Sequence, residues 1–408
     1  MTILESPQPN TAVPNGAVPN TAEEILAAVR AIAPELRDRS VEIEQNRRLP
    51  ADVVELMRGA GVFRMGFGSE FGGAGLTSAE QTRVIEALSY GDTAAGWCGM
   101  IGMDSGLYSA YLSPAAVREM FPSPDMITGG LINPNGRAER VPGGYRLSGH
   151  WNLGSGVTHA DWVSAGAFTY TEGEQDRNEH GNPNWRVMLV RPENVKVIDT
   201  WHATGLAGSG SVDYEIDDVF VPEDHTFSFG KPLSRGGPLS APDALMRKMP
   251  GVPLGAARAA LDYVRELAAA KVNRMTGQRW ADDYRVQFEL GSCEADFLTM
   301  RHGVYGSIEH KWDRLESGVA YADLTPEERV ETVLLALKAF RGALDIVRRL
   351  YDLLATTSIY KPSPMDRWLR DLNTMCQHVM AQDVIVQSAG AYLLGGTPRF
   401  PFAVGITE

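Results

Sequence analysis

Residues 205–222 read GLAGSGSVDYEIDDVFVP, a glycine- and serine-rich turn that leads into an alternating apolar pattern. One face of the strand predicted by this alternation carries Val212, Tyr214 and Ile216. The alternation slips at Asp217–Asp218 and then resumes, which indicates a β-bulge. Pro222 is expected to end the strand, because proline has no N–H to donate to a neighbouring strand.

The bulk composition is that of a globular protein with two or three domains. The chain has 408 residues, of which 44% are hydrophobic and 22% charged, and its formal net charge is −13. This charge argues against a nucleic-acid surface, which needs clustered Lys and Arg. No apolar run is long enough to cross a membrane, and we expect no secretory signal. The three cysteines have neither disulfide-framework nor zinc spacing, so we expect a reducing, cytoplasmic environment.

The sequence pattern changes along the chain, and four segments are expected. Residues 1–20 are rich in Pro, Asn and Thr and predict a disordered tail. Residues 21–125 predict a helical domain. Residues 126–232 contain short period-two segments and predict an antiparallel β-domain, and residues 233–408 predict a helical bundle. The fold class is therefore α+β.

Capping motifs predict where several helices begin. The expected start residues are Thr21, Pro50, Ser78, Asp92 and Thr325. The helix that starts near Asp92 carries Trp97. The last helix is expected to run from Met365 past His378.

Several common catalytic motifs are missing from the sequence. No bundle helix carries the Glu-x-x-His pair of a di-iron site, and there is no His-Glu-x-x-His or Gly-x-Ser-x-Gly segment. Gly-x-Gly-x-x-Gly is also missing, which disfavours a nicotinamide-binding Rossmann domain. We therefore expect no metal centre and no serine nucleophile.

Several segments, in the same order along the chain, resemble the acyl-CoA dehydrogenase superfamily. They are Glu70–Leu76, Asn133–Ala138, Trp151–Gly156, Gly205–Pro222 and Arg370–Asp371. The second and third resemble flavin-facing strands, and the last resembles the "RD" pair of the final bundle helix. The resemblance implies an N-terminal helical domain, a middle antiparallel β-domain and a C-terminal four-helix bundle.

Two departures resemble the flavin-dependent monooxygenase branch of that superfamily. The dehydrogenases use a glutamate base, which many members place shortly after the "RD" pair, but no glutamate lies between Asp371 and Glu408. His378 stands in that region instead. The dehydrogenase "QxxGGxGY" segment is replaced by Ala355–Tyr360. These features resemble the oxygenase components of two-component systems, such as p-hydroxyphenylacetate hydroxylase.

The resemblance implies a reaction and its partners. Reduced FAD or FMN would come from a separate NAD(P)H–flavin reductase, and O₂ would be the co-substrate. A C4a-(hydro)peroxyflavin would hydroxylate a small aromatic substrate, phenolic or indole-like. The protein would be a homotetramer. The alternatives are an acyl-CoA dehydrogenase-like FAD enzyme, an N- or S-oxygenase of the same fold, and a non-catalytic flavin or acyl-carrier binding protein.

The resemblance also implies a set of site residues. His378 would be catalytic and bind substrate, because imidazole titrates near neutrality and can take or share a substrate proton. Ser155 would act on flavin N5 through its hydroxyl, and Trp97 would line the substrate pocket. The expected cofactor contacts are Asn133, Trp151, Ser155, Gly156 and Arg274. Turn or core packing is the structural alternative for several of these residues, including Trp151 and Trp97.

Overall fold

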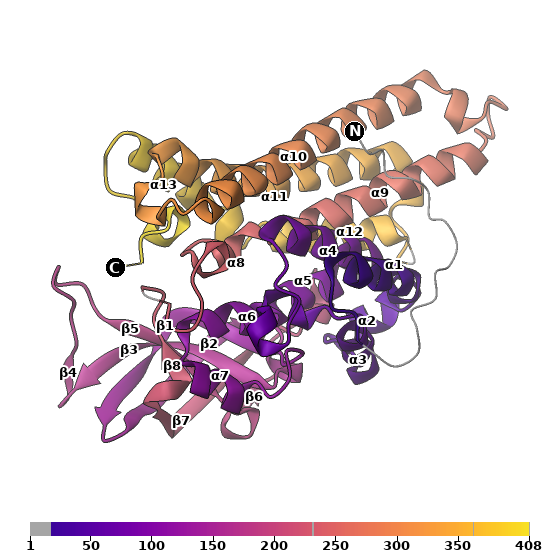
Figure 1. Cartoon of the computed structure of the whole chain (residues 1–408). Coiled ribbons are helices and arrows are strands. Elements are labelled where there is room, and N and C mark those ends of the chain that lie inside the picture. Colours follow the sequence, from indigo (N-terminus) through magenta and orange to yellow (C-terminus); the bar gives the residue numbers. More distant parts are fainter. Residues whose placement is uncertain (1–17, 231, 362, 408) are drawn as a thin grey trace.

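The computed structural model describes residues 18–230, 232–361 and 363–407. Most of the expected tail, residues 1–17, lies outside the described residues. In Figure 1 the long C-terminal helices lie at the top and the sheet lies at the lower left, and part of the N-terminal helical region lies between them. None of the described helices is long and apolar enough to cross a bilayer.

The N-terminal part is helical, as expected. Its helices are α1 (Ala22–Asp38), α2 (Ser40–Asn46), α3 (Ala51–Gly59), α4 (Ser78–Gly91), α5 (Thr93–Gly102), α6 (Asp104–Tyr108) and α7 (Pro114–Met120). Thr21 and Asp92 are N-caps, which confirms two expected starts. The expected cap at Ser78 is wrong by one residue. Thr77 caps α4, because its side chain accepts from the Glu80 N–H while its own backbone N–H donates to the Glu80 carboxylate at 2.8 Å.

The middle part is one eight-stranded sheet. Its strands are β1 (Thr128–Val141), β2 (Gly144–Gly154), β3 (Trp162–Thr171), β4 (Glu174–Gln175), β5 (Trp185–Val190), β6 (Lys196–Ile198), β7 (Val212–Pro222) and β8 (Thr226–Phe227). The order is β6-β7-β2-β1-β3-β5-β8, with β4 paired to β3. All described pairs are antiparallel except β1 with β3, which is parallel.

One strand pair departs from the expected antiparallel arrangement, which the other six described pairs follow. Strand β2 turns back along one side of β1, and the chain then crosses to place β3 on the other side of β1. Two reversals of direction leave β3 running the same way as β1. The polar and glycine-rich composition of β1 hid this strand from the period-two pattern, and its pairing with β3 is irregular around Pro134.

The bulge predicted in β7 is confirmed. Leu147 of β2 pairs with Val219, whereas Gly149 pairs with Ile216, so β7 has one extra residue between these pairs. Asp218, within the bulge, has a positive φ of 49°. The strand ends at Pro222, as the sequence predicts.

The C-terminal part is built of long packed helices. They are α8 (Ala244–Arg247), α9 (Gly251–Ala270), α10 (Tyr284–Glu316), α11 (Pro326–Leu354), α12 (Pro364–Met375) and α13 (Asp383–Leu393). Thr325 caps α11 and exchanges hydrogen bonds with Glu328, which confirms the expected start. The apolar side chains of α9, α10, α11 and α12 form part of one core with the N-terminal helices.

The last expected helix is wrong in its extent. Helix α12 ends at Met375, and His378 lies in the following turn with an extended backbone (ψ 145°). The Gln382 side chain donates to the Cys376 carbonyl at 2.6 Å and so satisfies one acceptor at the helix end. His378 is therefore a turn residue between α12 and α13, where backbone geometry does not confine it to one face of a helix.

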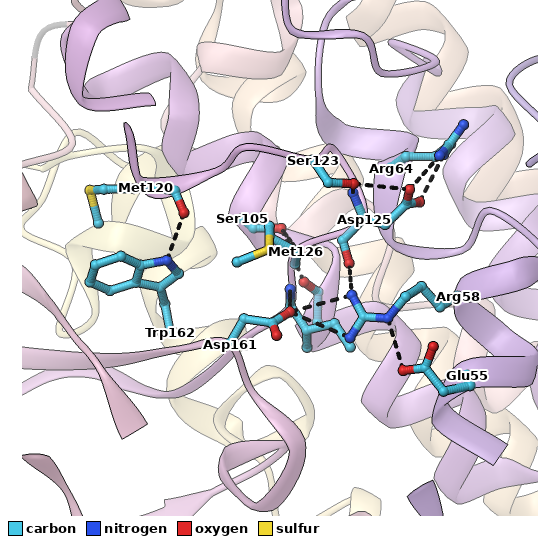
Figure 2. Close-up of polar contacts among 12 residues, drawn as sticks. Glu55, Arg58, Arg64, Ser105, Met120, Ser123, Asp125, Met126, Asp161 and Trp162 are labelled. Atoms are coloured by element: carbon cyan, nitrogen blue, oxygen red, sulfur yellow. Dashed lines mark hydrogen bonds and ion pairs between the residues drawn. The ribbon is translucent and has the colours of Figure 1, made fainter. Parts of the chain in front are cut away.

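Polar contacts join the N-terminal helices to the start of the sheet (Figure 2). Arg58 of α3 donates to the Asp125 carbonyl and lies 3.4 Å from the Asp161 carboxylate. The same carboxylate accepts the Ile127 N–H at 2.7 Å. These contacts hold the segment before β1 and the start of β3 against α3, and so orient the sheet relative to the helices.

Candidate active site

Three residues from distant parts of the sequence meet where the helices face the sheet. Trp97 lies on α5, Ser155 directly follows β2, and His378 follows α12. The Trp97 indole N–H donates to Ser155 Oγ at 3.0 Å. The imidazole of His378 packs edge-on to the Trp97 ring, with centroids 5.5 Å apart and an interplanar angle of 76°. The structure therefore brings together the two residues predicted to be catalytic and the residue predicted to line the substrate pocket.

Ser155 sits in a tight buried turn. Leu153 and Gly156 both have positive φ, 57° and 78°, and the Ser155 N–H donates back to the Leu153 carbonyl at 2.9 Å. Glycine accepts this backbone conformation readily, but leucine adopts it only at a conformational cost. Leu153 is also 55% exposed, although it is large and apolar. Backbone strain of this kind clusters at functional sites.

A chain of serine hydroxyls continues from Ser155 into the loop before β7. Ser155 Oγ lies 2.6 Å from Ser211 Oγ, and Ser211 Oγ lies 2.7 Å from Ser209 Oγ. A serine hydroxyl has one hydrogen and two lone pairs. Trp97 and Ser211 use two of these three positions at Ser155, so one remains for a ligand.

His378 is partly buried, and this keeps its imidazole neutral at neutral pH. Partial removal from water lowers the pKa of the imidazole to about 4. Nδ1 accepts the Met380 N–H at 3.3 Å, so we assign the hydrogen of the neutral ring to Nε2. No described residue accepts a hydrogen bond from Nε2. At neutral pH His378 therefore presents a hydrogen-bond donor.

Two of the other predicted cofactor residues lie in the sheet. Trp151 is fully buried, its indole N–H donates to the Gly166 carbonyl at 2.8 Å, and its ring stacks on Tyr214. These contacts are those of a core residue. Asn133 is exposed on β1, the strand that approaches the Ser155 turn through the Gly130 N–H, which donates to the Ser155 carbonyl at 3.1 Å.

Arg274 lies outside this group. It is exposed in the connection between α9 and α10, at the far end of the bundle from the sheet (Figure 1). Within one chain it is therefore not placed with Ser155 and His378.

The sequence interpretation gave no role to three residues that join the site. Ser209 and Ser211 extend the hydroxyl chain, and the Asp371 carboxylate accepts the Leu206 N–H at 2.6 Å. All three lie in segments whose resemblance to the family was noted without a role for these residues. The available signals were the two serines beside Gly208 and Gly210 and the aspartate of the "RD" pair, whereas the sequence carries no signal for the strained backbone of Leu153.

Comparison with known proteins identifies the family. The model described as Acyl-CoA dehydrogenase, N-terminal domain, matches residues 19–119, and the model described as Acyl-CoA dehydrogenase, C-terminal domain, matches residues 250–383. An indole-3-acetate monooxygenase from Pseudomonas putida is 31% identical over 392 residues, which cover 94% of this chain and 97% of that protein. The chain belongs to the flavin-dependent monooxygenase branch of the acyl-CoA dehydrogenase superfamily. The predicted family and fold class are thus confirmed.

Further relatives agree with this membership. The oxygenase component of an FADH(2)-dependent resorcinol hydroxylase from a Rhizobium species is 27% identical, over 92% of this monooxygenase and 95% of that protein. Two solved structures share the fold. The HsaA monooxygenase from M. tuberculosis has a TM-score of 0.82 and 21% identity, over 93% of this chain and 99% of that chain. XiaF from Streptomyces sp., in complex with FADH2 and glycerol, has a TM-score of 0.83 and 24% identity, over 93% and 96%.

The residues of the site fit the flavin that this family uses. A flavin is a flat ring whose edge carries nitrogen and oxygen atoms, so it needs a few placed polar groups and an apolar bed. Ser155 offers its remaining hydrogen-bonding position, and Leu153 offers exposed apolar surface beside it. Ser155 accepts a hydrogen bond from the Trp97 indole N–H, whereas His378 packs edge-on to the Trp97 ring. The monooxygenase therefore has polar groups for more than one ligand.

Proposed function

We propose that this monooxygenase is the oxygenase component of a two-component system that hydroxylates a small aromatic compound, phenolic or indole-like. The observation that carries the proposal is the contact of Trp97 with both Ser155 and His378. It places a hydroxyl with spare capacity and a neutral imidazole donor around one aromatic ring. The names of the relatives, which include an indole-3-acetate monooxygenase and a resorcinol hydroxylase, support an aromatic substrate.

Each residue has a distinct role in this proposal. When bound, reduced FAD or FMN supplies the electrons that activate O₂. Ser155 hydrogen-bonds the edge of the flavin ring, and Asn133 contacts it from β1. His378 donates its Nε2–H to the polar group of the substrate and so orients the ring. Trp97 forms an apolar wall, and the burial of Trp97 and Ser155 excludes water from their side of the site.

The proposal includes a separate reductase. The sequence contains no Gly-x-Gly-x-x-Gly segment for a nicotinamide, so an NAD(P)H–flavin reductase supplies the reduced flavin. We place both proteins in the cytoplasm, where reduced nicotinamide is available. The three cysteines, Cys98, Cys293 and Cys376, are free and buried in the structure, which agrees with a reducing compartment.

The proposal also includes a homotetramer assembled through the C-terminal helices. Three large apolar side chains are exposed on one face of α10, namely Tyr284, Phe288 and Leu298. A second copy of the chain that covers this face would remove them from water. Arg274, at the same end of the bundle as the start of α10, would then reach the flavin phosphates of a neighbouring subunit.

Rapid mixing of the reduced flavin–protein complex with oxygenated buffer tests the function. We expect a transient absorbing species before flavin reoxidation, and hydroxylated product from a panel of phenols and indoles, detected by mass spectrometry. One-step reoxidation with no product from any aromatic compound would contradict the proposal. Reduction of a dye by an acyl-CoA would replace it with the dehydrogenase alternative, and oxygen found only on a ring nitrogen or sulfur would replace hydroxylation.

A further inference from the structure

The loop Gly205–Ser211 is held at both of its ends. At one end it lies against α12, and at the other end its serines bond to Ser155. We propose that Asp371 is a positioning residue that holds this loop, so that Ser211 sets the hydrogen bond of Ser155 toward the flavin. The inference rests on the proposed function, because it concerns the same site.

The contact with α12 fixes an unfavourable backbone conformation. Leu206 has a φ of 50°, and its N–H donates to Asp371 Oδ1 at 2.6 Å. A leucine leaves the left-handed region unless surrounding contacts hold it there. A side chain at Gly205 would overlap the Arg370 carbonyl, so the loop packs directly on the helix backbone. The Arg370 side chain adds a hydrogen bond to the Thr204 carbonyl at 2.8 Å.

The other end of the loop determines what Ser155 can offer a ligand. The Trp97 indole N–H can only donate, so it occupies one lone pair of Ser155. If Ser155 donates its hydrogen to Ser211, a lone pair remains for a donor on the ligand. If Ser211 donates instead, Ser155 keeps its hydrogen for an acceptor. Reduced flavin carries a hydrogen on N5 and oxidised flavin does not, so the direction of the Ser155–Ser211 bond selects between the two forms.

To hold the loop, Asp371 must accept the Leu206 N–H, and either an ionised or a protonated carboxyl can do this. Its side chain is buried, and burial raises the pKa of the carboxyl to about 7, with the nearby Asp92 acting in the same direction. Near neutral pH both the ionised and the protonated form are populated, and an oxygen of either form accepts the Leu206 N–H. The amide oxygen introduced by Asp371→Asn is the same kind of acceptor, so this variant should leave the loop in place, whereas Asp371→Leu removes the acceptor.

The first test uses the flavin-free protein. In ¹⁵N-labelled protein, the Trp97 indole N–H signal, assigned as the one missing from Trp97→Phe, reports the hydrogen bond to Ser155. We expect this signal to shift in Asp371→Leu and in Ser211→Ala, and to stay at its wild-type position in Asp371→Asn. The control is Asp345→Leu, which replaces a more exposed carboxylate on α11. Because no flavin is present, this result stands or falls independently of the hydroxylation reaction.

The second test measures reoxidation of chemically reduced FMN or FAD bound to each variant. Loss of one buried hydrogen bond predicts reoxidation about tenfold faster in Asp371→Leu and Ser211→Ala than in wild type, with Asp371→Asn unchanged. An unmoved Trp97 signal in Asp371→Leu, or equal effects of the asparagine and leucine variants, would overturn the proposal. If the leucine variant does not fold, Asp371→Ser replaces it, because serine is too short to reach the Leu206 N–H, and the same outcomes decide.

Discussion

At the scale of single residues, the protonation state of His378 decides what the site can do. The sequence indicates an imidazole able to act as acid, base or donor. Partial burial and the Met380 N–H on Nδ1 leave a neutral ring with its hydrogen on Nε2. A group of this kind orients a substrate hydroxyl or ring nitrogen without taking a proton from it, so positioning is its main contribution at neutral pH.

We predict that His378→Ala lowers the yield of hydroxylated product per flavin oxidised by about a hundredfold, the loss expected when a reacting group is misplaced. Binding of reduced flavin should change little, because the flavin contacts that we propose lie on the sheet. His378→Gln keeps a side-chain N–H donor and should retain part of the yield. Product and hydrogen peroxide measured together check this, and an unchanged product yield in His378→Ala would remove His378 from the mechanism.

The lowered pKa of His378 also predicts the pH dependence of stability. The folded protein binds fewer protons at this site than the unfolded chain between about pH 4 and pH 6.5. The contribution to stability is therefore complete above pH 6.5 and is lost as the pH falls toward 4, by up to about 1.4 kcal/mol per pH unit. The difference in unfolding free energy between wild type and His378→Gln should fall in this window. A difference that is constant from about pH 4.5 to pH 7.5 would contradict the lowered pKa of His378.

At the scale of elements, the loop Gly205–Ser211 packs on α12. This contact joins two segments that resemble the family, Gly205–Pro222 and Arg370–Asp371. The first glycine of the loop lies where any side chain would overlap the Arg370 carbonyl. The glycine there provides close backbone approach, which is a different use from the positive φ of Gly210 in the same loop.

Gly205→Ala should therefore destabilise the folded protein by about 1–3 kcal/mol, the usual cost of inserting a methyl group into packed structure. Gly236→Ala is a matched control, because a side chain there meets no atom within 4 Å and the backbone has no positive φ. Urea unfolding of both variants checks the prediction. If the two variants prove equally stable, the close packing of the loop on α12 is not present in solution.

At the scale of the whole molecule, the exposed apolar face of α10 is the surface through which we propose that copies of the chain assemble. This face carries Tyr284, Phe288 and Leu298, and Phe288 lies one helical turn after Tyr284. Large apolar side chains exposed on one helix face favour contact with another surface.

We predict that Phe288→Glu shifts the protein to smaller species in sedimentation velocity at fixed concentration, since a buried carboxylate at an interface is unfavourable. Val197→Glu is the control, because Val197 is also exposed but lies on β6 in the sheet. Wild-type protein that sediments as a monomer, or an unchanged oligomer in Phe288→Glu, would contradict assembly through this face.

The sequence alone determined the features that depend on neighbours along the chain. The N-caps at Thr21, Asp92 and Thr325 and the bulge at Asp217–Asp218 were predictable, because capping and alternation are local properties of the backbone. Segments that resemble the family, in the same order along the chain, indicated the family and the flavin chemistry. Local sequence patterns did not predict the polar strand β1 or the end of α12. At the end of α12 the side chain of Gln382 donates to the Cys376 carbonyl.

Only the tertiary structure decided which of the candidate residues meet. Trp97, Ser155 and His378 come from a helix, a strand end and a turn, and their contact depends on how the bundle and the sheet pack together. The same packing places Trp151 in the core of the sheet and Arg274 at the far end of the bundle. It also brings the Asp371 carboxylate to the Leu206 N–H. Residue types and spacing carry the chemistry, whereas burial and long-range contacts set the pKa of His378 and the free hydrogen-bonding position of Ser155.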